Sequence, residues 1–320
     1  MLDMPRNETV ISRVGATTGA HRHTTRQAGT IQGTISLDQD LNSMPVPRVF
    51  EASTNHVDHW VHVLGTLLQL GTPDTRAALV SELCGDPLDG TDRMQVSERR
   101  AVKHGDSELV VDLVLRNGSD WVVGVVAALG FGLDHSDRVA AAADALSGLG
   151  AAYTQVILLV PDRRAGELVD EAANPRITQK SWLRVRDWVQ ERPERGNAQG
   201  TDLVLLREAE YFYTPRVAEL YRLEDLAPTM DAAVRAGFTE AYLDLNDLAP
   251  APTILTPADG RFEAAFPRTG DQPVRMTAGG GAPTVSVDGG PSVTLDGPDA
   301  YQAQRGAVVA AARAALPNRK

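Results

Sequence analysis

Residues 107–130 read SELVVDLVLRNGSDWVVGVVAALG and contain two apolar runs of nearly equal length. The four residues between the runs, Asn117 to Asp120, begin with Asn-Gly. Asn-Gly between apolar runs is the strongest short-range signal for a β-hairpin. Both runs are too continuously apolar for strands with one solvated face. The stretch therefore predicts two adjacent strands in the middle of a sheet that is covered on both sides.

Asp112 places a carboxylate within the apolar part of the first strand, whereas the second strand has no charge from Val122 to Ala128. Burial of an unpaired charge costs free energy, so the Asp112 side chain needs a partner. Two interpretations stay open. Asp112 is either the vestige of a metal site or a residue whose carboxylate accepts hydrogen bonds from backbone donors near the end of the strand.

The composition is that of a soluble globular protein, with 42% hydrophobic and 23% charged residues. The net charge of -11 argues against broad, non-specific nucleic-acid binding, which needs a basic surface, but it leaves room for a local basic groove. The only cysteine, Cys84, cannot form a disulfide within the chain, which fits a reducing cytoplasm. No apolar run has the length of a membrane span. We therefore expect a cytoplasmic protein with no membrane partner.

Apolar spacing and turn residues predict further elements on both sides of the hairpin. Helices are expected over residues 49–70, 73–85, 137–146, 182–191, 215–226, 230–237 and 300–316. Three of them are expected to begin at side-chain N-caps, namely Thr72, Ser136 and Ser181. Strands are expected over residues 94–102, 154–160 and 202–206. The second strand of the hairpin, the helix 137–146 and the strand 154–160 form a crossover unit, which predicts that the two strands run parallel.

Three regions are expected along the chain. Residues 1–47 are rich in Thr, Gly, Arg and Ser with little periodicity, which predicts a disordered leader. Residues 48–249 contain the hairpin and most of the predicted helices, which indicates an α/β domain. Residues 250–320 alternate and have four Gly-containing turns, which predicts a β-meander that a final helix closes.

Six features of the chain follow one another in a recognisable order. They are a helix that begins at Phe50-Glu51, a strand with Glu98, a hairpin with Asp112, a small-residue helix at 137–146, a strand that ends at Val160-Pro161 and a helix that opens at Ser181-Trp182. This order resembles that of the PD-(D/E)XK nuclease superfamily, the restriction-endonuclease-like proteins, over about residues 49–213. The resemblance implies an α/β fold with a mixed central sheet flanked by helices.

The resemblance also implies a specific chemistry. In that superfamily an Asp on one strand and a Glu or Asp on the next bind Mg²⁺, and a Lys two residues later positions or activates the attacking water. Asp112 matches the first acid, and Glu51 matches a helix acid that sometimes assists. The second acid would fall within residues 124–126 and the lysine within 126–128, yet these residues are Gly, Val and Ala. Because a hard divalent cation generally needs more than one carboxylate, we expect no cofactor and no hydrolysis by the usual mechanism.

The first functional hypothesis is therefore a catalytically degenerate nuclease-like protein. It would act as a binding or assembly module, and the resemblance alone suggests DNA processing or phage defence. Vestigial site residues would be Asp112, Glu98 and Glu51. The partner, protein or nucleic acid, and the oligomeric state stay open. A third and simpler interpretation is a structural protein in which Asp112 has no functional role.

The alternative is an active Mg²⁺-dependent nuclease whose site has migrated. In that case Glu98, Asp134 or Asp137 would join Asp112 at the metal. Lys103 or Arg138 would supply the positive charge. The competing interpretation of Asp134 and Asp137 is that they complement the dipole at the start of a helix.

Three histidines, His56, His59 and His62, recur every third residue in the first predicted helix. A pair at this spacing can bind zinc. The first and third lie roughly 120° apart around the helix axis, so the three cannot easily converge on one ion. We favour a polar helix flank over a metal site. For Trp182 and Trp188 we favour core packing over base stacking. For the aromatic residues 211–213 we favour core packing over the covering of a binding surface.

Overall fold

A computed structural model of the chain describes residues 56–130, 135–161, 174–226, 232–248, 253–255, 261–266, 274–279, 284–287, 292–294 and 300–315. The chain divides into the units Met1–Pro45 and Val46–Lys320, and every described residue belongs to the second unit. The disordered leader that we expect over residues 1–47 thus lies outside the described residues, as does the start of the first predicted helix.

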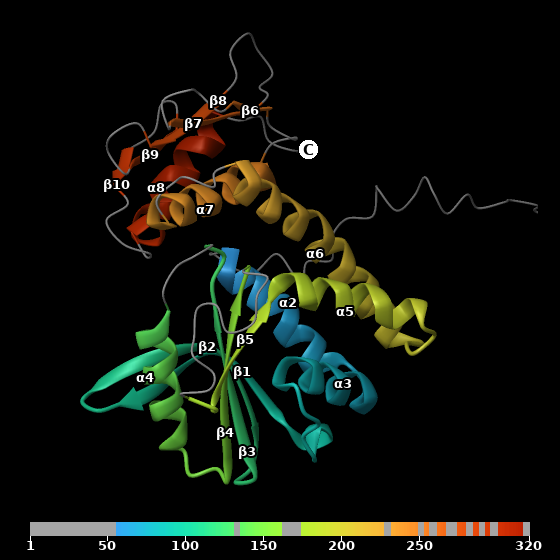
Figure 1. Cartoon of the computed structure of the whole chain (residues 1–320). Coiled ribbons are helices and arrows are strands. Elements are labelled where there is room, and N and C mark those ends of the chain that lie inside the picture. Colours follow the sequence, from blue (N-terminus) through green and yellow to red (C-terminus); the bar gives the residue numbers. More distant parts are fainter. Residues whose placement is uncertain are drawn as a thin grey trace, which may run out of the picture. The chain divides into compact units, whose positions relative to one another are not determined.

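The first sheet has five strands in the order β1-β2-β3-β4-β5 (Figure 1). The strands are β1 (Gln95–His104), β2 (Ser107–Asn117), β3 (Trp121–Ala127), β4 (Tyr153–Val160) and β5 (Ile177–Ser181). β1, β2 and β3 are antiparallel neighbours, whereas β3, β4 and β5 are parallel neighbours. The sheet is therefore mixed, and the predicted hairpin is confirmed as β2 and β3. The parallel pairing of β3 with β4 is confirmed as well.

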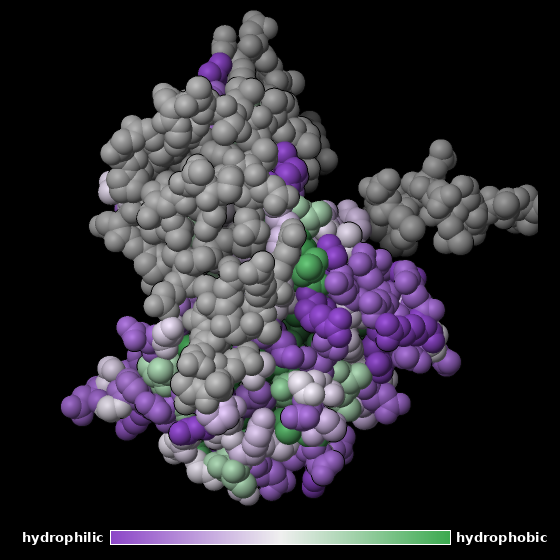
Figure 2. Space-filling view, in the orientation of Figure 1, coloured by the Kyte–Doolittle hydropathy of each residue, from purple (hydrophilic) through white to green (hydrophobic). Residues whose placement is uncertain are grey.

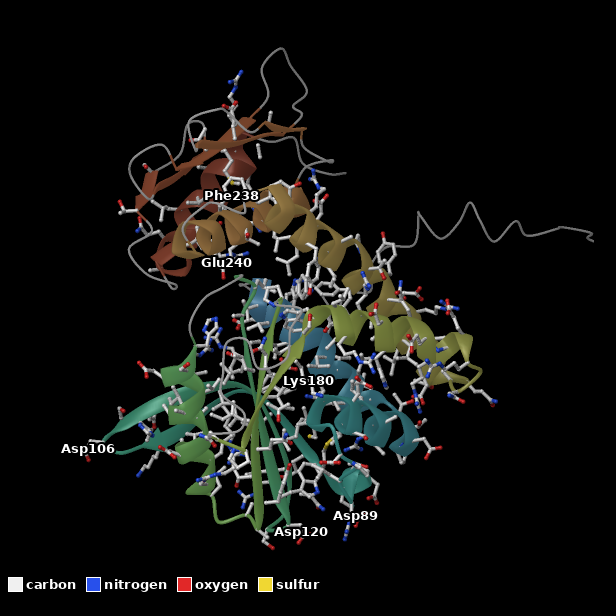
Figure 3. The ribbon with its side chains drawn as sticks, in the orientation of Figure 1. Asp89, Asp106, Asp120, Lys180, Phe238 and Glu240 are labelled. Atoms are coloured by element: carbon white, nitrogen blue, oxygen red, sulfur yellow. The ribbon has the colours of Figure 1, made fainter. Side chains whose placement is uncertain are left out.

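The turns of the two hairpins follow from their residues. Gly118, in the β2–β3 turn, has a φ of 55°, which a glycine adopts without the steric strain of a side chain. Asp106 and Asp120 mark the two turns in Figure 3, Asp106 between β1 and β2 and Asp120 between β2 and β3. Both turns carry exposed polar residues, which fits their place at the ends of the strands.

Helices cover both faces of this sheet (Figure 1). They are α2 (His56–Leu70), α3 (Pro73–Cys84), α4 (Ser136–Ser147), α5 (Trp182–Glu194) and α6 (Thr201–Leu226), with a short 3-10 helix η2 at Thr91–Arg93. One apolar core joins one face of the sheet to α2, α3, α5 and α6. A second core joins the opposite face to α4. The coarse fold prediction, a mixed sheet flanked by helices, is therefore confirmed.

The side chains of β3 explain why its sequence is continuously apolar. Trp121, Val123 and Val125 belong to the core with α2 and α5. Val122 and Val126 belong to the core with α4. Every residue of β3 is buried, so both faces exclude charged side chains.

Helix ends agree with the sequence at two of three predicted caps. Thr72 caps α3 and its hydroxyl accepts a hydrogen bond from Thr75 N, while Ser181 caps α5 and accepts from Leu183 N. The prediction that Ser136 caps a helix is wrong by one residue. The N-cap of α4 is His135, whose side chain makes no capping hydrogen bond.

The predicted strand over residues 202–206 is wrong, because these residues lie in α6. The buried residues Asp202, Leu206, Ala209 and Tyr213 recur at helical spacing. Pro215 does not start a new helix but lies inside α6. The sequence also gave no signal for β5, an edge strand with only five residues.

The second sheet is antiparallel and has the order β10-β9-β8-β7-β6. Its strands are β6 (Thr253–Leu255), β7 (Arg261–Phe266), β8 (Val274–Gly279), β9 (Thr284–Val287) and β10 (Ser292–Thr294). β9 and β10 pair as an antiparallel hairpin, as the predicted β-meander requires. The boundary at residue 249 stays a prediction.

Two helices, α7 (Ala232–Leu248) and α8 (Ala300–Ala315), accompany the second sheet. A buried polar group joins them: the Asp244 carboxylate accepts hydrogen bonds from the Tyr301 hydroxyl at 2.7 Å and from the Arg305 guanidinium at 2.5–3.0 Å. The predicted closing helix is thus anchored through a charged pair.

The face of the helical layer that is visible in Figure 2 is largely polar. Figure 2 shows hydrophilic side chains over α3 and α5 in this view. Among the described helices, none combines the length and the apolar character that crossing a membrane requires.

Candidate functional site

Asp112 lies where β2 separates from β3. The pairing of β2 with β3 runs from Asn117 opposite Trp121 to Leu113 opposite Val125 and ends there. β2 nevertheless continues beside β1 as far as Ser107. The pairing with β3 therefore stops at Leu113, the residue that follows Asp112 in the chain, and the backbone of β3 beyond Val125 has no β2 neighbour on that edge.

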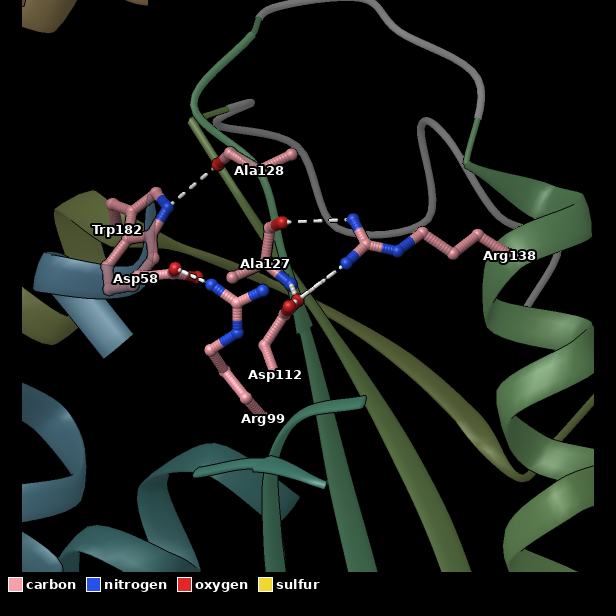
Figure 4. A network of polar contacts seen from close by, with 7 residues as sticks. All are labelled: Asp58, Arg99, Asp112, Ala127, Ala128, Arg138 and Trp182. Carbon is pink, nitrogen blue, oxygen red and sulfur yellow. Dashed lines mark hydrogen bonds and ion pairs between the residues drawn. The ribbon is translucent and has the colours of Figure 1, made fainter. Parts of the chain in front are cut away.

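The Asp112 carboxylate replaces the missing neighbour (Figure 4). Ala128 N donates to Leu159 O on β4, so the preceding amide, Ala127 N, points to the opposite edge. Ala127 N donates to Asp112 Oδ2 at 2.7 Å. A buried backbone amide would otherwise lack an acceptor. Asp112 therefore completes the hydrogen bonding of β3.

Arg138, in the first turn of α4, is the second partner of Asp112 (Figure 4). Its Nη2 donates to Asp112 Oδ1 at 3.0 Å and to Oδ2 at 2.9 Å. Its Nη1 donates to Ala127 O at 3.3 Å. One guanidinium thus binds the carboxylate and the backbone of β3 together.

The electrostatics of this group are those of a buried ion pair. Asp112 is 7% exposed. Burial raises the pKa of the Asp112 carboxyl above its ordinary value, while Arg138 and then the Ala127 amide act in the opposite direction. Desolvation is the largest of these effects, so the two partners favour the charged form without fully offsetting the cost of burial.

Two further contacts surround the same end of β3. Trp182 Nε1, on α5, donates to Ala128 O at 2.9 Å. Arg99 on β1 forms an ion pair with Asp58 on α2 (Figure 4). Arg99 has a φ of 47°, an uncommon conformation for a residue with a side chain, and it lies between the β1–β2 pairs of Glu98 and Arg100. The end of β3 is thus held by side chains from several elements.

The other predicted acids do not approach Asp112 among the described residues. Glu98 accepts a hydrogen bond from His62 Nδ1 on α2, at 2.9 Å to Oε2. Asp137 is an exposed residue in the first turn of α4, where it can complement the helix dipole. Glu51 and Asp134 lie outside the described residues. Within the described part of the chain, no group of three His, Cys, Asp or Glu side chains could hold a metal ion.

The structure also shows why residues 124–128, where the resemblance would place an acid and a lysine, are small and apolar. Gly124 packs so closely against α4 that an added Cβ would lie 2.4 Å from Leu146 Cδ1 and 3.2 Å from Val111 Cγ1. The following residues to Ala128 are all buried. This part of β3 serves the two apolar cores.

The three histidines do not share one environment. His62 binds Glu98, and the His59 ring packs against Phe212 with centroids 4.8 Å apart. The side chain of His56 lies outside the described residues. Core packing of the aromatic residues holds for Trp182, Phe212 and Tyr213, which are buried. Tyr211 differs, because it is 47% exposed.

A second polar group, which the sequence did not reveal, lies between α3 and α6. The buried Asp202 accepts hydrogen bonds from Thr72 N at 2.9 Å, Thr72 Oγ1 at 2.5 Å and Thr75 Oγ1 at 2.6 Å. Burial alone would raise the pKa of Asp202, but these hydrogen bonds and Arg192 outweigh it and lower the pKa. A cavity of about 540 Å³ opens beside it. The lining residues are Thr72, Asp74, Arg192, Gly196, Asn197, Gln199 and Asp202.

Comparison of the chain with protein-family models, curated proteins and solved structures found no match. The resemblance to the PD-(D/E)XK nucleases therefore stays a prediction.

Proposed function

We propose that this chain is a restriction-endonuclease-like protein without hydrolytic activity, which acts as a binding or assembly module. The mixed sheet and the place of Asp112 on β2, beside the end of β3, support the nuclease-like fold. The absence of any acid or lysine in residues 121–128 supports the loss of hydrolysis.

One observation carries the proposal: the Asp112 carboxylate is engaged by a guanidinium and a backbone amide. A metal ligand must offer its oxygen lone pairs to the cation. Both Asp112 oxygens already accept from Arg138, and Oδ2 also accepts from Ala127 N. If the chain has the proposed fold, Arg138 would take the place of Mg²⁺ beside Asp112, and its guanidinium balances the charge of the carboxylate at all ordinary pH values.

A cleavage assay with the full chain tests the loss of hydrolysis. The substrates are single- and double-stranded DNA and RNA with Mg²⁺ or Mn²⁺, and calorimetry follows Mn²⁺ binding. We expect no cleavage, and we expect Asp112→Asn and the exposed turn variant Asp120→Asn to leave the Mn²⁺ titration equally unchanged. Cleavage that Asp112→Asn abolishes and Asp120→Asn preserves would overturn the proposal.

A second measurement identifies the class of partner. Fluorescence polarisation with labelled single- and double-stranded DNA and RNA, without metal and at low salt, detects a local nucleic-acid site on this acidic protein. Salt-sensitive binding indicates a nucleic-acid partner. Its absence across all four probes favours a protein partner for the module.

The alternative function is an active Mg²⁺-dependent nuclease with a migrated site. That function needs a positive charge beside Asp112, and the pairing with Arg138 supports this requirement. The function needs a second acid there too. Among the described residues, Glu98 binds His62 and Asp137 is exposed, so neither fills this role as placed. In the same cleavage assay, activity that Arg138→Lys reduces and Arg138→Met abolishes would establish the alternative.

A further inference from the structure

The helix α6 carries a stripe of four side chains on one face, and the two apolar ones are largely exposed. Val204, Arg207, Glu208 and Tyr211 lie at positions i, i+3, i+4 and i+7, which places them on one face of a helix. Val204 is 60% exposed and Tyr211 is 47% exposed. These are two of the most exposed large apolar side chains among the described residues. The four residues are named the α6 stripe below.

The charged residues at the centre of the α6 stripe are incompletely paired. Glu208 is half-buried and has no hydrogen-bond or ion-pair partner among the described residues. Burial raises the pKa of its carboxyl, with no cation acting in the opposite direction. Among the residues that the structure describes, Arg207 is paired with Glu210 alone, at 2.5 Å, and its side chain is 51% exposed. A cation brought close to Glu208 would offset the cost of its burial.

The α6 stripe is complementary to itself. An antiparallel α6 of a second copy, related by a two-fold axis between Arg207 and Glu208, places each Val204 opposite a Tyr211. The same axis places each Arg207 opposite a Glu208. Every contact then occurs twice, as in an isologous interface. The arrangement brings apolar side chains together at both ends and opposite charges together in the middle.

We propose that the α6 stripe is a homodimer contact and that its occupant is a second copy of this chain. Charge complementarity favours a second copy, since the stripe supplies both the cation and the carboxylate that the arrangement needs. A single helix pair buries little area, so the dimer is weak and depends on concentration. The inference goes beyond the proposed function and uses α6 alone, so either can fail without the other.

Sedimentation equilibrium of the full chain over a range of concentrations tests the proposal. We expect the average mass to rise from monomer toward dimer as concentration increases. Tyr211→Ser and Val204→Ser should each weaken association, whereas Val110→Ser, which changes a valine 43% exposed on β2, should not. A chain that stays monomeric at every concentration would overturn the proposal.

A charge exchange provides the sharper test. Arg207→Glu alone places like charges opposite each other twice per dimer, as does Glu208→Arg alone, and each should weaken the dimer by about tenfold or more. The double variant Arg207→Glu/Glu208→Arg restores opposite charges and should recover most of the affinity. Thermal melting of each variant confirms that it is folded. A dimer that none of these changes affects would use another surface and would contradict the proposal.

Discussion

The Nη2 atom of Arg138 lies 3.0 Å from Oδ1 and 2.9 Å from Oδ2 of Asp112, although the residues are 26 positions apart. Nη1 of the same side chain reaches Ala127 O. Arg138 therefore ties the first turn of α4 to both β2 and β3 at the point where these strands separate. Since a guanidinium keeps its charge at all ordinary pH values, the ionised form of Asp112 is stabilised without a metal ion.

Arg138→Met should destabilise the protein, because Asp112 would remain buried with only the Ala127 amide as a partner. We expect a loss of roughly 2 kcal/mol at neutral pH, less than the roughly 3–5 kcal/mol of a fully buried pair, since the Arg138 side chain is 37% exposed. Urea unfolding measures the loss. The exposed Arg195, paired with Glu191, provides the control: Arg195→Met should cost less than about 0.5 kcal/mol.

The loss in Arg138→Met should depend on pH with a definite sign. Removal of Arg138 raises the pKa of Asp112 further, because Arg138 is the main group that lowers it. A carboxyl whose folded pKa exceeds its unfolded value binds more protons when folded, so stability falls as pH rises between the two values. The difference from the wild type should therefore grow as pH rises from the folded pKa of the wild type to the higher folded pKa of the variant. A difference that does not vary with pH would show that Asp112 is not the cause.

Gly124→Ala should destabilise the protein although alanine is only one carbon larger. Its Cβ would lie 2.4 Å from the fully buried Leu146 Cδ1. We expect a cost of about 1–3 kcal/mol in thermal or urea unfolding. In a Leu146→Ala background the same change should cost less than about 0.5 kcal/mol, because the obstructing atom is gone. Equal costs in both backgrounds would mean that the close approach of α4 to β3 is not the reason for the glycine.

At this site the local elements could be predicted from the sequence, but the contacts between distant residues could not. The hairpin of β2 and β3 was predictable because Asn117-Gly118 and the two apolar runs are local signals. That β3 contains no acid was also visible in the sequence. That Asp112 meets Arg138 depends on how α4 packs on the sheet, and Arg138 could only be named as one of two candidate cations.

The error at α6 has a different physical origin. A short apolar run such as residues 203–206 fits a strand and a buried helix equally well. Only the spacing of apolar residues over a longer stretch of sequence distinguishes the two. The role of Asp202 depends on contacts with Thr72, which lies 130 positions away in the chain. No local pattern encodes a contact of that range, although Thr72-Pro73 did predict the start of α3.

Asp202→Asn should destabilise the protein at neutral pH. Both carboxylate oxygens of Asp202 accept hydrogen bonds, one at Oδ1 and two at Oδ2, whereas the side chain of asparagine has one acceptor oxygen. The cost should be about 1–3 kcal/mol. The folded pKa of Asp202 is lowered, so its stabilising contribution is present above the unfolded pKa and is lost as pH falls through the folded value. The difference between variant and wild type should therefore shrink in acid. Asp74→Asn, at an exposed site in the first turn of α3, is the matched control and should cost well under about 1 kcal/mol.

Cys84 should be inert toward thiol reagents in the folded protein. The thiol is buried, and burial raises its pKa to about 12, with a smaller opposing effect from Lys180 on β5 (Figure 3). At about pH 8 the thiolate then makes up roughly one part in ten thousand of the thiol. Labelling should require opening of the structure, so its rate should rise with denaturant in parallel with the unfolded fraction.

A second thiol at an exposed turn makes this measurement internally controlled. Ser119→Cys, between β2 and β3, should add a fast phase of labelling at native conditions while the slow phase of Cys84 stays unchanged. The ratio of the two rates then reports the free energy of the opening that exposes Cys84. If both thiols reacted at the same rate in the absence of denaturant, Cys84 would be accessible, and its position in the apolar core between α3 and the sheet would be wrong.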